Sequence, residues 1–196
     1  MTVAAAAPSI IPAMSAAPNL LDLDFTNFVP VAKATDGGEA RADTQIGDRS
    51  AEQGGNLVFY TRTGIKRPAP AADAPVLVVD DDEITRRVLA RVLGAKGLPV
   101  RTAADSKELQ QVMRLPPLPR LILLDVGLPR ISGFRILQLL RQHPQTSAIP
   151  IVLVTASAEN RDIAQGLALG ADGYLSKPLT VATLNSAIDR ILQRPA

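Results

Sequence analysis

The chain has 196 residues, enough for one ordinary domain with a tail or for two small domains. Hydrophobic residues make up 46% but aromatic residues only 3%, so a core must be built from aliphatic side chains. The absence of Cys excludes disulfides, thiolate metal sites and Cys nucleophiles. The net charge of +2 favours no particular partner, and the basic residues are scattered, which argues against direct DNA binding.

The N-terminal residues 1–19 are apolar, but their pattern is not that of a signal peptide or a membrane span. They lack a basic start, and Pro8, Pro12 and Pro18 would interrupt a helix. No segment of the chain approaches the roughly 20 apolar residues of a spanning helix. We therefore expect a cytoplasmic protein that does not contact a membrane.

Residues 1–74 are rich in Ala, Pro, Gly, Asp and Thr and show little hydrophobic periodicity. This composition predicts a disordered N-terminal extension, ending in a Pro/Ala linker from Arg67. Two apolar pieces, Leu20–Val31 and Asn56–Thr61, leave open a second interpretation, in which a short docking segment folds on a partner.

From Val76 the pattern changes to five short apolar runs that alternate with amphipathic segments. The apolar runs predict strands at residues 76–80, 98–103, 120–125, 149–156 and 172–176. The amphipathic segments predict helices beginning near Ile84, Asp105, Ser132, Glu159 and Thr180. Asp105 or Ser106 can cap the second of these helices and Ser132 the third, and Gly94, Gly97 and Gly170 are expected to end helices.

This alternation predicts an α/β domain over residues 75–196, with a five-stranded parallel sheet and right-handed crossovers. The middle runs are apolar on both faces, as expected for strands that lie between two layers of helices.

Polar residues end the predicted strands. Asp80 and Asp81 follow the first, Asp125 ends the third, Thr155 the fourth, and Lys177 follows the fifth. Ligands of open parallel sheets gather beyond the carboxyl ends of the strands, so we expect these side chains to converge.

Together these residues have the chemistry of a phosphoryl-binding site. Three carboxylates repel one another unless a cation lies among them, and hard oxygen ligands suit Mg²⁺ or Mn²⁺. Lys177 would offset charge on the phosphoryl oxygens, and Thr155 would donate a hydrogen bond. Asp125, a single Asp at the end of the most apolar strand, is the candidate nucleophile and would form an acyl phosphate.

Four stretches, VLVVDDDE, LILLDVGLPRISGF, IVLVTASAE and GADGYLSKPL, resemble in order and spacing the signatures of the bacterial response-regulator receiver domain (CheY-like). The resemblance covers Pro75 to about Gln193. It implies a flavodoxin-like (βα)5 fold with strand order 2-1-3-4-5 and helices on both faces.

The resemblance also implies roles for individual residues. Asp125 is the phosphoacceptor, Asp81 a direct Mg²⁺ ligand, and Asp80 a ligand acting mostly through water. The backbone carbonyl of Gly127 is the third protein ligand of the metal. Lys177 contacts the phosphoryl group.

Three further positions match the family. Thr155 is the hydroxyl residue that moves toward the phosphoryl group, and Tyr174 is the aromatic rotamer switch. Taken alone Tyr174 could be a half-buried edge aromatic, but its position four before Pro178 favours the switch. Pro178 is expected to follow a cis peptide bond that aims Lys177 into the site.

Other residues near the site have simpler interpretations. Asp82 and Glu83 are expected to form a solvated helix start rather than to bind metal. His143, the only His, is expected on the surface rather than as a phosphohistidine. Gly127 and Ser157 flank the site, and because Gly127 has no side chain to orient water, we hypothesise slow self-dephosphorylation.

The leading functional hypothesis is a phosphorelay receiver, not an enzyme, phosphorylated by a sensor histidine kinase or a histidine phosphotransfer protein. Its effector would bind the face formed by the fourth helix, fifth strand and fifth helix. An alternative is an adaptor whose N-terminal segment binds a partner. A third, a phosphatase, would need a second Asp where the chain has Gly127.

Overall fold

The structure is a computed structural model and describes residues 44–52, 55–62, 67, 69–156 and 159–192. The predicted segment Leu20–Val31 lies outside these residues, as does Ser157. The elements in chain order are β1 (Thr44–Glu52), β2 (Gly55–Arg62), β3 (Val76–Val79), α1 (Glu83–Ala95), β4 (Val100–Ala103), α2 (Ser106–Met113), β5 (Leu121–Asp125), α3 (Gly133–Gln142), β6 (Ile151–Thr155), α4 (Asn160–Ala168), β7 (Gly173–Ser176) and α5 (Val181–Leu192).

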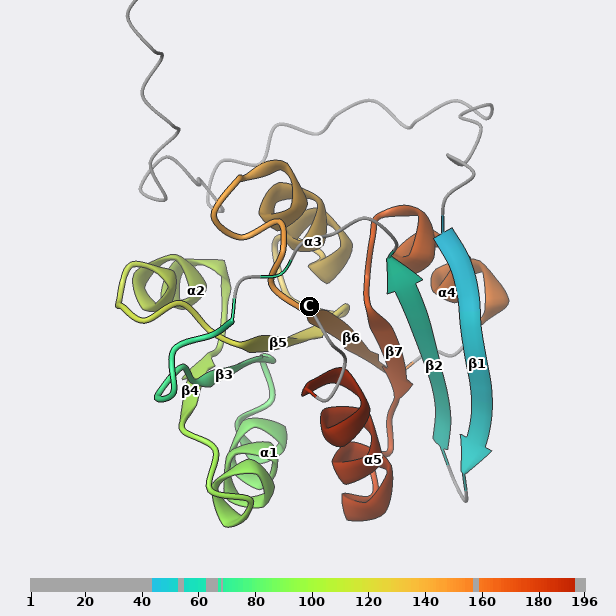
Figure 1. Cartoon of the computed structure of the whole chain (residues 1–196), viewed down its shortest axis with the longest axis horizontal. Coiled ribbons are helices and arrows are strands. Elements are labelled where there is room, and N and C mark those ends of the chain that lie inside the picture. The colour runs from blue at the N-terminus through green and yellow to red at the C-terminus, as the bar shows by residue number, and fades with distance from the viewer. Residues whose placement is uncertain (1–43, 53–54, 63–66, 68, 157–158, 193–196) are drawn as a thin grey trace, which may run out of the picture.

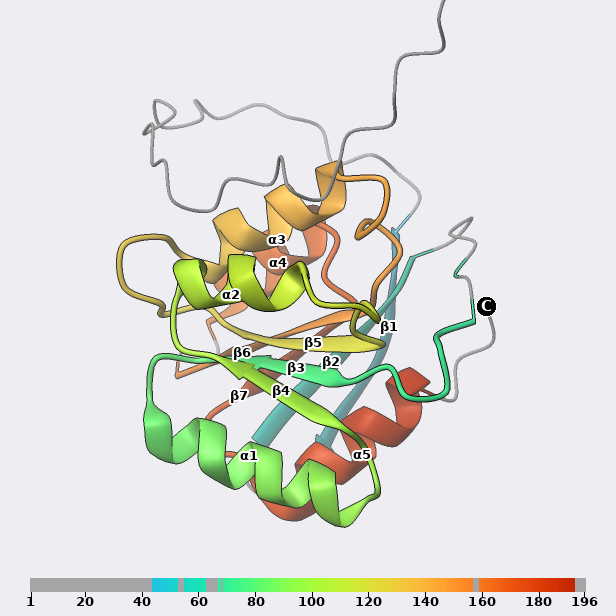
Figure 2. The same cartoon turned by 90° about the vertical axis from the view of Figure 1, so that its left-hand side faces the viewer.

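Five parallel strands form the centre of the sheet. Their order is β4-β3-β5-β6-β7, which is the expected order 2-1-3-4-5, so the predicted fold class is confirmed. Helices α1 and α5 cover one face of the sheet, and α2, α3 and α4 cover the other (Figures 1 and 2). None of the helices in the described ranges is long and apolar enough to cross a bilayer.

The parallel strands are buried on both faces because successive side chains point into opposite helical layers. In β3, Leu77 and Val79 join the core under α2, α3 and α4, whereas Val76 and Val78 join the core under α1 and α5. Tyr174 of β7 belongs to the first of these cores and is fully buried, so its interpretation as a half-buried edge residue is wrong.

The helix boundaries follow the expected capping residues closely. The side chain of Asp105 caps α2 and that of Ser132 caps α3. Gly97 and Gly170 adopt positive φ values of 76° and 84° after α1 and α4, a conformation that glycine takes without steric cost. Gly94 lies inside α1 instead of ending it.

Part of the N-terminal extension, which was expected to be disordered, forms two strands in the described ranges. Strands β1 and β2 pair antiparallel with each other, and β2 pairs antiparallel with β7. They extend the parallel sheet to seven strands, with β1 at the outer edge (Figure 1). The apolar piece Asn56–Thr61 therefore docks on the chain's own sheet. Residues 1–43 lie outside the described ranges.

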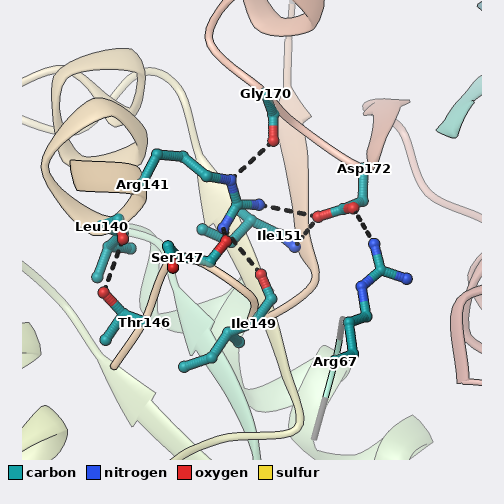
Figure 3. Close-up of polar contacts among 9 residues, drawn as sticks. All are labelled: Arg67, Leu140, Arg141, Thr146, Ser147, Ile149, Ile151, Gly170 and Asp172. Atoms are coloured by element: carbon teal, nitrogen blue, oxygen red, sulfur yellow. Dashed lines mark hydrogen bonds and ion pairs between the residues drawn. The ribbon is translucent and has the colours of Figure 1, made fainter. Parts of the chain in front are cut away.

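The segment expected to be a linker is also attached to the domain. Arg120 donates hydrogen bonds to three of its carbonyl groups, those of Ala71, Ala72 and Ala74, at 2.7–3.0 Å. Earlier in the segment, Arg67 pairs with Asp172, the residue directly before β7 (Figure 3). These contacts lie at the amino end of the sheet, away from Asp125.

Asp172 is a buried junction between three parts of the chain. It is 0% exposed, binds Arg141 of α3 at 2.8 Å, and accepts a hydrogen bond from the Ile151 N–H at 2.8 Å. Arg141 also donates to backbone carbonyls of Gly170, Ser147 and Ile149 (Figure 3). The carboxylate thus joins α3, the starts of β6 and β7, and the N-terminal segment.

Candidate functional site

The predicted site residues meet at the carboxyl ends of the parallel strands. Asp125 ends β5, Thr155 ends β6, Asp80 follows β3, and Lys177 follows β7. The strand register places Asp125 opposite Val154 on β6, one residue before Thr155. Four strands therefore deliver the four side chains to one edge, as the topology predicts.

Lys177 forms the centre of the site. Its Nζ lies 2.9 Å from Asp125 Oδ1 and 2.7 Å from Asp80 Oδ2. The two carboxylate side chains are only 5% and 2% exposed, whereas that of Lys177 is 25% exposed. Two nearly buried carboxylates thus share one ammonium group.

Burial and this ion pairing have opposite effects on the pKa values. Burial raises the pKa of Asp125 above 3.8, and its contacts with Lys177 only partly offset this effect. Burial alone would lower the pKa of Lys177, but its close contacts with the carboxylates of Asp80 and Asp125 outweigh burial and raise the pKa. Lys177 is therefore held as a cation next to a carboxylate that is costly to keep charged.

The acidic residues after β3 have separate surroundings. The carboxylate of Asp80 accepts a hydrogen bond from the Asp82 N–H at 3.0 Å, while Asp81 is exposed. Asp82 caps α1 by accepting hydrogen bonds from the N–H groups of Ile84 and Thr85. The Thr85 hydroxyl also donates to the Asp82 carboxylate, and this bond is the largest of those that lower the pKa of Asp82. The expected helix-start role of Asp82 is confirmed.

One contact of the site was missed by sequence reasoning. Arg86, one turn into α1, donates from Nη1 to the backbone carbonyl of Asp80 at 2.7 Å. This bond holds the end of β3 against α1. In the sequence, Arg86 is simply a basic residue on an amphipathic helix, and nothing in the pattern indicates a bond to the Asp80 carbonyl.

The oxygen donors fit a hard divalent cation in part. Asp80 Oδ2 is buried and, despite the nearby Lys177 Nζ, accepts no hydrogen bond of normal geometry, so it retains capacity to coordinate. Asp125 and the exposed Asp81 supply further carboxylate oxygens of the type that Mg²⁺ prefers. Within the described ranges, however, no three acidic or His side chains are already gathered around one point. Asp81 would have to turn toward the other two carboxylates.

Gly127 and Gly133 bring the loop after β5 close to Asp125. The Gly127 N–H bonds to the Asp125 carboxylate, and a Cβ at Gly127 would lie 3.1 Å from Asp125 Oδ2. A Cβ at Gly133 would lie 2.2 Å from the backbone oxygen of Asp125, which no side chain could tolerate without a shift. Between them, Arg130 adopts a φ of 70°.

Thr155 and Tyr174 connect the site to the last parallel strand. Burial raises the pKa of Tyr174, and a side-chain hydrogen bond with Thr155 acts in the opposite direction. The Lys177 N–H donates to the Thr155 carbonyl at 2.6 Å. The bond between Lys177 and Pro178 is cis, as expected.

His143 is not a surface residue, so that expectation is wrong. It is 6% exposed at the end of α3, and its Nδ1 accepts a hydrogen bond from the Gln145 N–H at 3.3 Å. It lies in the loop leading to the amino end of β6, at the opposite end of the sheet from Asp125.

Comparison with curated proteins finds transcriptional regulators among the relatives. The chain is 40% identical over 119 residues to the probable transcriptional regulator ycf27 of Cyanophora paradoxa, covering 61% of this chain and 48% of that protein. It is 36% identical over 121 residues to the phosphate regulon transcriptional regulatory protein PhoB of Rhizobium meliloti, covering 61% and 52%. The chain thus spans about half the length of the curated relatives it matches. The expectation of no DNA binding finds no support in relatives with these names.

Solved structures give the same domain. The chemotaxis protein CheY4 of Vibrio cholerae matches with a TM-score of 0.56 and 32% identity, covering 61% of this chain and 98% of that one. A putative response regulator from Chloroflexus aurantiacus matches with a TM-score of 0.58 and 36% identity, covering 62% and 98%. The family model of the response regulator receiver domain matches residues 76–189. Over these residues the chain belongs to the response regulator receiver domain family of two-component signalling.

Proposed function

We propose that this receiver accepts a phosphoryl group on Asp125 from a histidine kinase or a histidine phosphotransfer protein. The single observation that carries the proposal is the pair of buried carboxylates, Asp80 and Asp125, held on one Lys177 ammonium at the carboxyl edge of the sheet. Such a site suits a negatively charged phosphoryl group, because the Lys177 ammonium can pair with the oxygen atoms of that group.

In the proposed reaction a carboxylate oxygen of Asp125 attacks phosphorus. The bond from the donor's histidine nitrogen to phosphorus breaks, its electron pair remains on the imidazole, and an acyl phosphate forms on Asp125. Lys177 pairs with the phosphoryl oxygens, and the hydroxyl of Thr155 donates to one of them. The chain's role in the proposed reaction is then to take the phosphoryl group onto its own Asp125 and to pass it on.

Asp80, Asp81, Asp125 and the backbone carbonyl of Gly127 are the groups that would hold a Mg²⁺ or Mn²⁺ ion. When bound, the ion supplies positive charge opposite Lys177, against the negative charge of the phosphoryl oxygens. Asp80 and Asp125 also repel each other less when such a charge lies between them.

The effector is proposed to be a protein that binds the face formed by α4, β7 and α5. Tyr174 lies on this last strand and is bonded to Thr155, so a movement of Thr155 changes the packing of β7. We propose a cytoplasmic location for these exchanges, which fits a chain without cysteine.

The test uses the full chain with Mg²⁺ and a small acyl phosphate as donor, followed by intact-mass measurement. We expect the mass of one phosphoryl group on the native chain and on Asp189→Asn, which changes a surface carboxylate. We expect none on Asp125→Asn. Modification that persists at full level in Asp125→Asn would contradict the proposal.

A further inference from the structure

Strand β2 occupies the outer edge of β7. Leu57 pairs with Leu175, Val58 with Tyr174, and Phe59 with Gly173. Without β2, β7 would be the edge of the parallel sheet and would present unpaired N–H and C=O groups. The N-terminal segment therefore adds a strand to the receiver, in the way that an extended peptide binds a sheet edge.

The pairing of β2 with β7 is short, and a short stretch of chain joins β2 to the receiver. It covers three residue pairs, and a two-stranded hairpin has little stability by itself. Only residues 63–66 separate Arg62 from Arg67, which is paired with Asp172, directly before β7. A short tether gives an effective concentration on the order of millimolar. The hairpin is thus kept near β7 by the chain connection as well as by its own strand pairing.

Strand β7 also contacts the phosphoacceptor site. Tyr174 pairs with Val58 on one side and with Leu153 of β6 on the other, and its side chain bonds to Thr155. Lys177 follows β7 directly and bonds to the Asp125 carboxylate. The four-residue strand β7 therefore carries the hairpin contact and the bond from Tyr174 to Thr155, and it leads directly into Lys177, which contacts Asp125.

We propose that the outer edge of β7 is a strand-docking surface whose resident partner is β2, and that phosphoryl transfer to Asp125 weakens this docking and opens the edge to an effector protein. In the structure in which β2 is paired with β7, Lys177 bonds directly to the Asp125 carboxylate and Thr155 bonds to Tyr174. A phosphoryl group draws Lys177 and Thr155 toward itself, which changes β7 at both points. This inference rests on the proposed function, because it requires phosphorylation of Asp125.

The first test is amide hydrogen exchange of the native full chain, with and without phosphorylation by an acyl phosphate. We expect faster exchange in residues 57–59 and 173–175 after phosphorylation, and unchanged exchange in the interior strand β5. The same samples are weighed by mass spectrometry. If no phosphoryl group is added, the proposed function fails. If one is added but exchange at 57–59 stays the same or slows, only the present inference fails.

The second test locks the hairpin in place. Because the chain has no cysteine, Leu57→Cys with Leu175→Cys introduces a single possible disulfide. Directly opposed residues of an antiparallel pair have Cα atoms about 4.5–5.5 Å apart, within the range of a disulfide. If phosphorylation loosens the hairpin, locking the hairpin must oppose phosphorylation by the same factor.

We expect the oxidised double variant to be phosphorylated several-fold less at equilibrium than the same protein after reduction, which serves as its matched control. Equal phosphorylation in the two redox forms overturns the proposal. The exchange experiment uses the native chain, so it decides the question even where the substituted protein folds poorly.

Discussion

Lys177 allows two carboxylates to lie side by side at the edge of the sheet. Asp80 is 1% exposed and Asp125 is 4% exposed, a degree of burial that a charged group tolerates only with a partner. Both are within 3 Å of the same ammonium. The two carboxylates therefore carry one more negative charge than the single Lys177 ammonium offsets, and this excess favours binding of a second cation.

The stability of the protein should reflect the charge on Asp125. Its pKa in the folded state is raised, so between 3.8 and that higher value the folded state binds more protons than the unfolded state. The free energy of unfolding therefore falls as the pH rises through this window. We expect Asp125→Asn to be more stable than the native protein at pH 7 without divalent cation, with the difference vanishing below about pH 4. Urea denaturation across this pH range is the measurement, and a variant less stable at pH 7 would contradict the argument.

The lifetime of the acyl phosphate should depend on Gly127. Its lack of a side chain leaves no amide or carboxyl group to orient water, so we expect the phosphorylated native protein to decay over minutes or longer. Gly127→Asn adds such an amide next to Asp125 Oδ2 and should shorten the lifetime. Gly127→Ala is the matched control: it adds the Cβ that lies 3.1 Å from Oδ2 without the amide, and should not decay faster. A native half-life of seconds, measured in Mg²⁺ buffer, would refute the idea.

At the scale of elements, α3 begins against the backbone of β5. Gly133 donates its N–H to the Val126 carbonyl at 3.1 Å, and its missing Cβ makes room for the Asp125 carbonyl. The close approach places the loop that carries Gly127 directly beside the carboxylate. Packing of α3 and geometry of the site therefore depend on the same glycine.

Two glycine substitutions should have opposite effects. Gly133→Ala places a Cβ 2.2 Å from backbone oxygen, and we expect a loss of about 1–3 kcal/mol or more, because the backbone must move. Gly94→Ala in α1 meets nothing within 4 Å and should gain about 0.5–1 kcal/mol from helix propensity. Chemical denaturation measures both values. Similar values for the two variants would show that the close contact at Gly133 is relieved without cost.

The junction at Asp172 should contribute more to stability than an exposed ion pair. Removing its charge in Asp172→Asn leaves the guanidinium groups of Arg67 and Arg141 without their buried carboxylate, and we expect a loss of about 3–5 kcal/mol. Asp189→Asn is the control. It breaks the half-exposed pair with Lys96 at 2.9 Å, which is worth about 0–1 kcal/mol after solvent screening. Thermal and urea unfolding of the two variants compare them directly, and equal losses would mean that Asp172 acts only as a surface charge.

At the scale of the whole molecule, the described part of the N-terminal segment is attached to the receiver by a strand pairing, an ion pair and a set of hydrogen bonds. These are the β2–β7 pairing, the Arg67–Asp172 ion pair, and the bonds from Arg120 to carbonyl groups of residues 71–74. The receiver and the segment preceding it thus share one sheet and one set of anchors.

Loss of one anchor should loosen one segment and leave the receiver intact. In Arg120→Gln we expect faster hydrogen exchange at the Ala74 amide, which bonds to the Ala71 carbonyl, without a large change in the exchange of β5. Arg101→Gln is the matched control, since Arg101 holds carbonyl groups of Leu115, Pro116 and Pro117 in the loop after α2. It should accelerate exchange at the Leu115 amide only. Loss of protection across the whole domain in Arg120→Gln would show that the anchor is part of the core.

Local patterns were sufficient to predict the parallel sheet and its helices, because period-2 and period-3.6 hydrophobicity is a property of neighbouring residues. The site was predictable for a related reason. In a parallel sheet the strands end at one edge, so residues such as Asp125 and Lys177, far apart in the chain, must meet once the strands are identified.

The features that were missed depend on contacts between distant segments. Strand β1 has the polar sequence TQIGDRSAE, and its partner β2 pairs with β7 more than a hundred residues later, so nothing local indicates the strand. Burial of His143 and the bond from Arg86 to Asp80 likewise arise from packing against other elements.

The sequence by itself determined the parallel α/β sheet and the edge where the acidic residues and the lysine meet, because hydrophobic periodicity identifies the strands and their ends. The receiver fold and its strand order were implied by the resemblance of the four motifs. Only the tertiary structure decided how these groups share charge and what lies against β7. The spacing of residues cannot tell whether Lys177 bonds to one carboxylate or two, nor whether an apolar segment of the extension pairs with a partner or with its own sheet. Both outcomes depend on distances between segments that the chain brings together only when it folds.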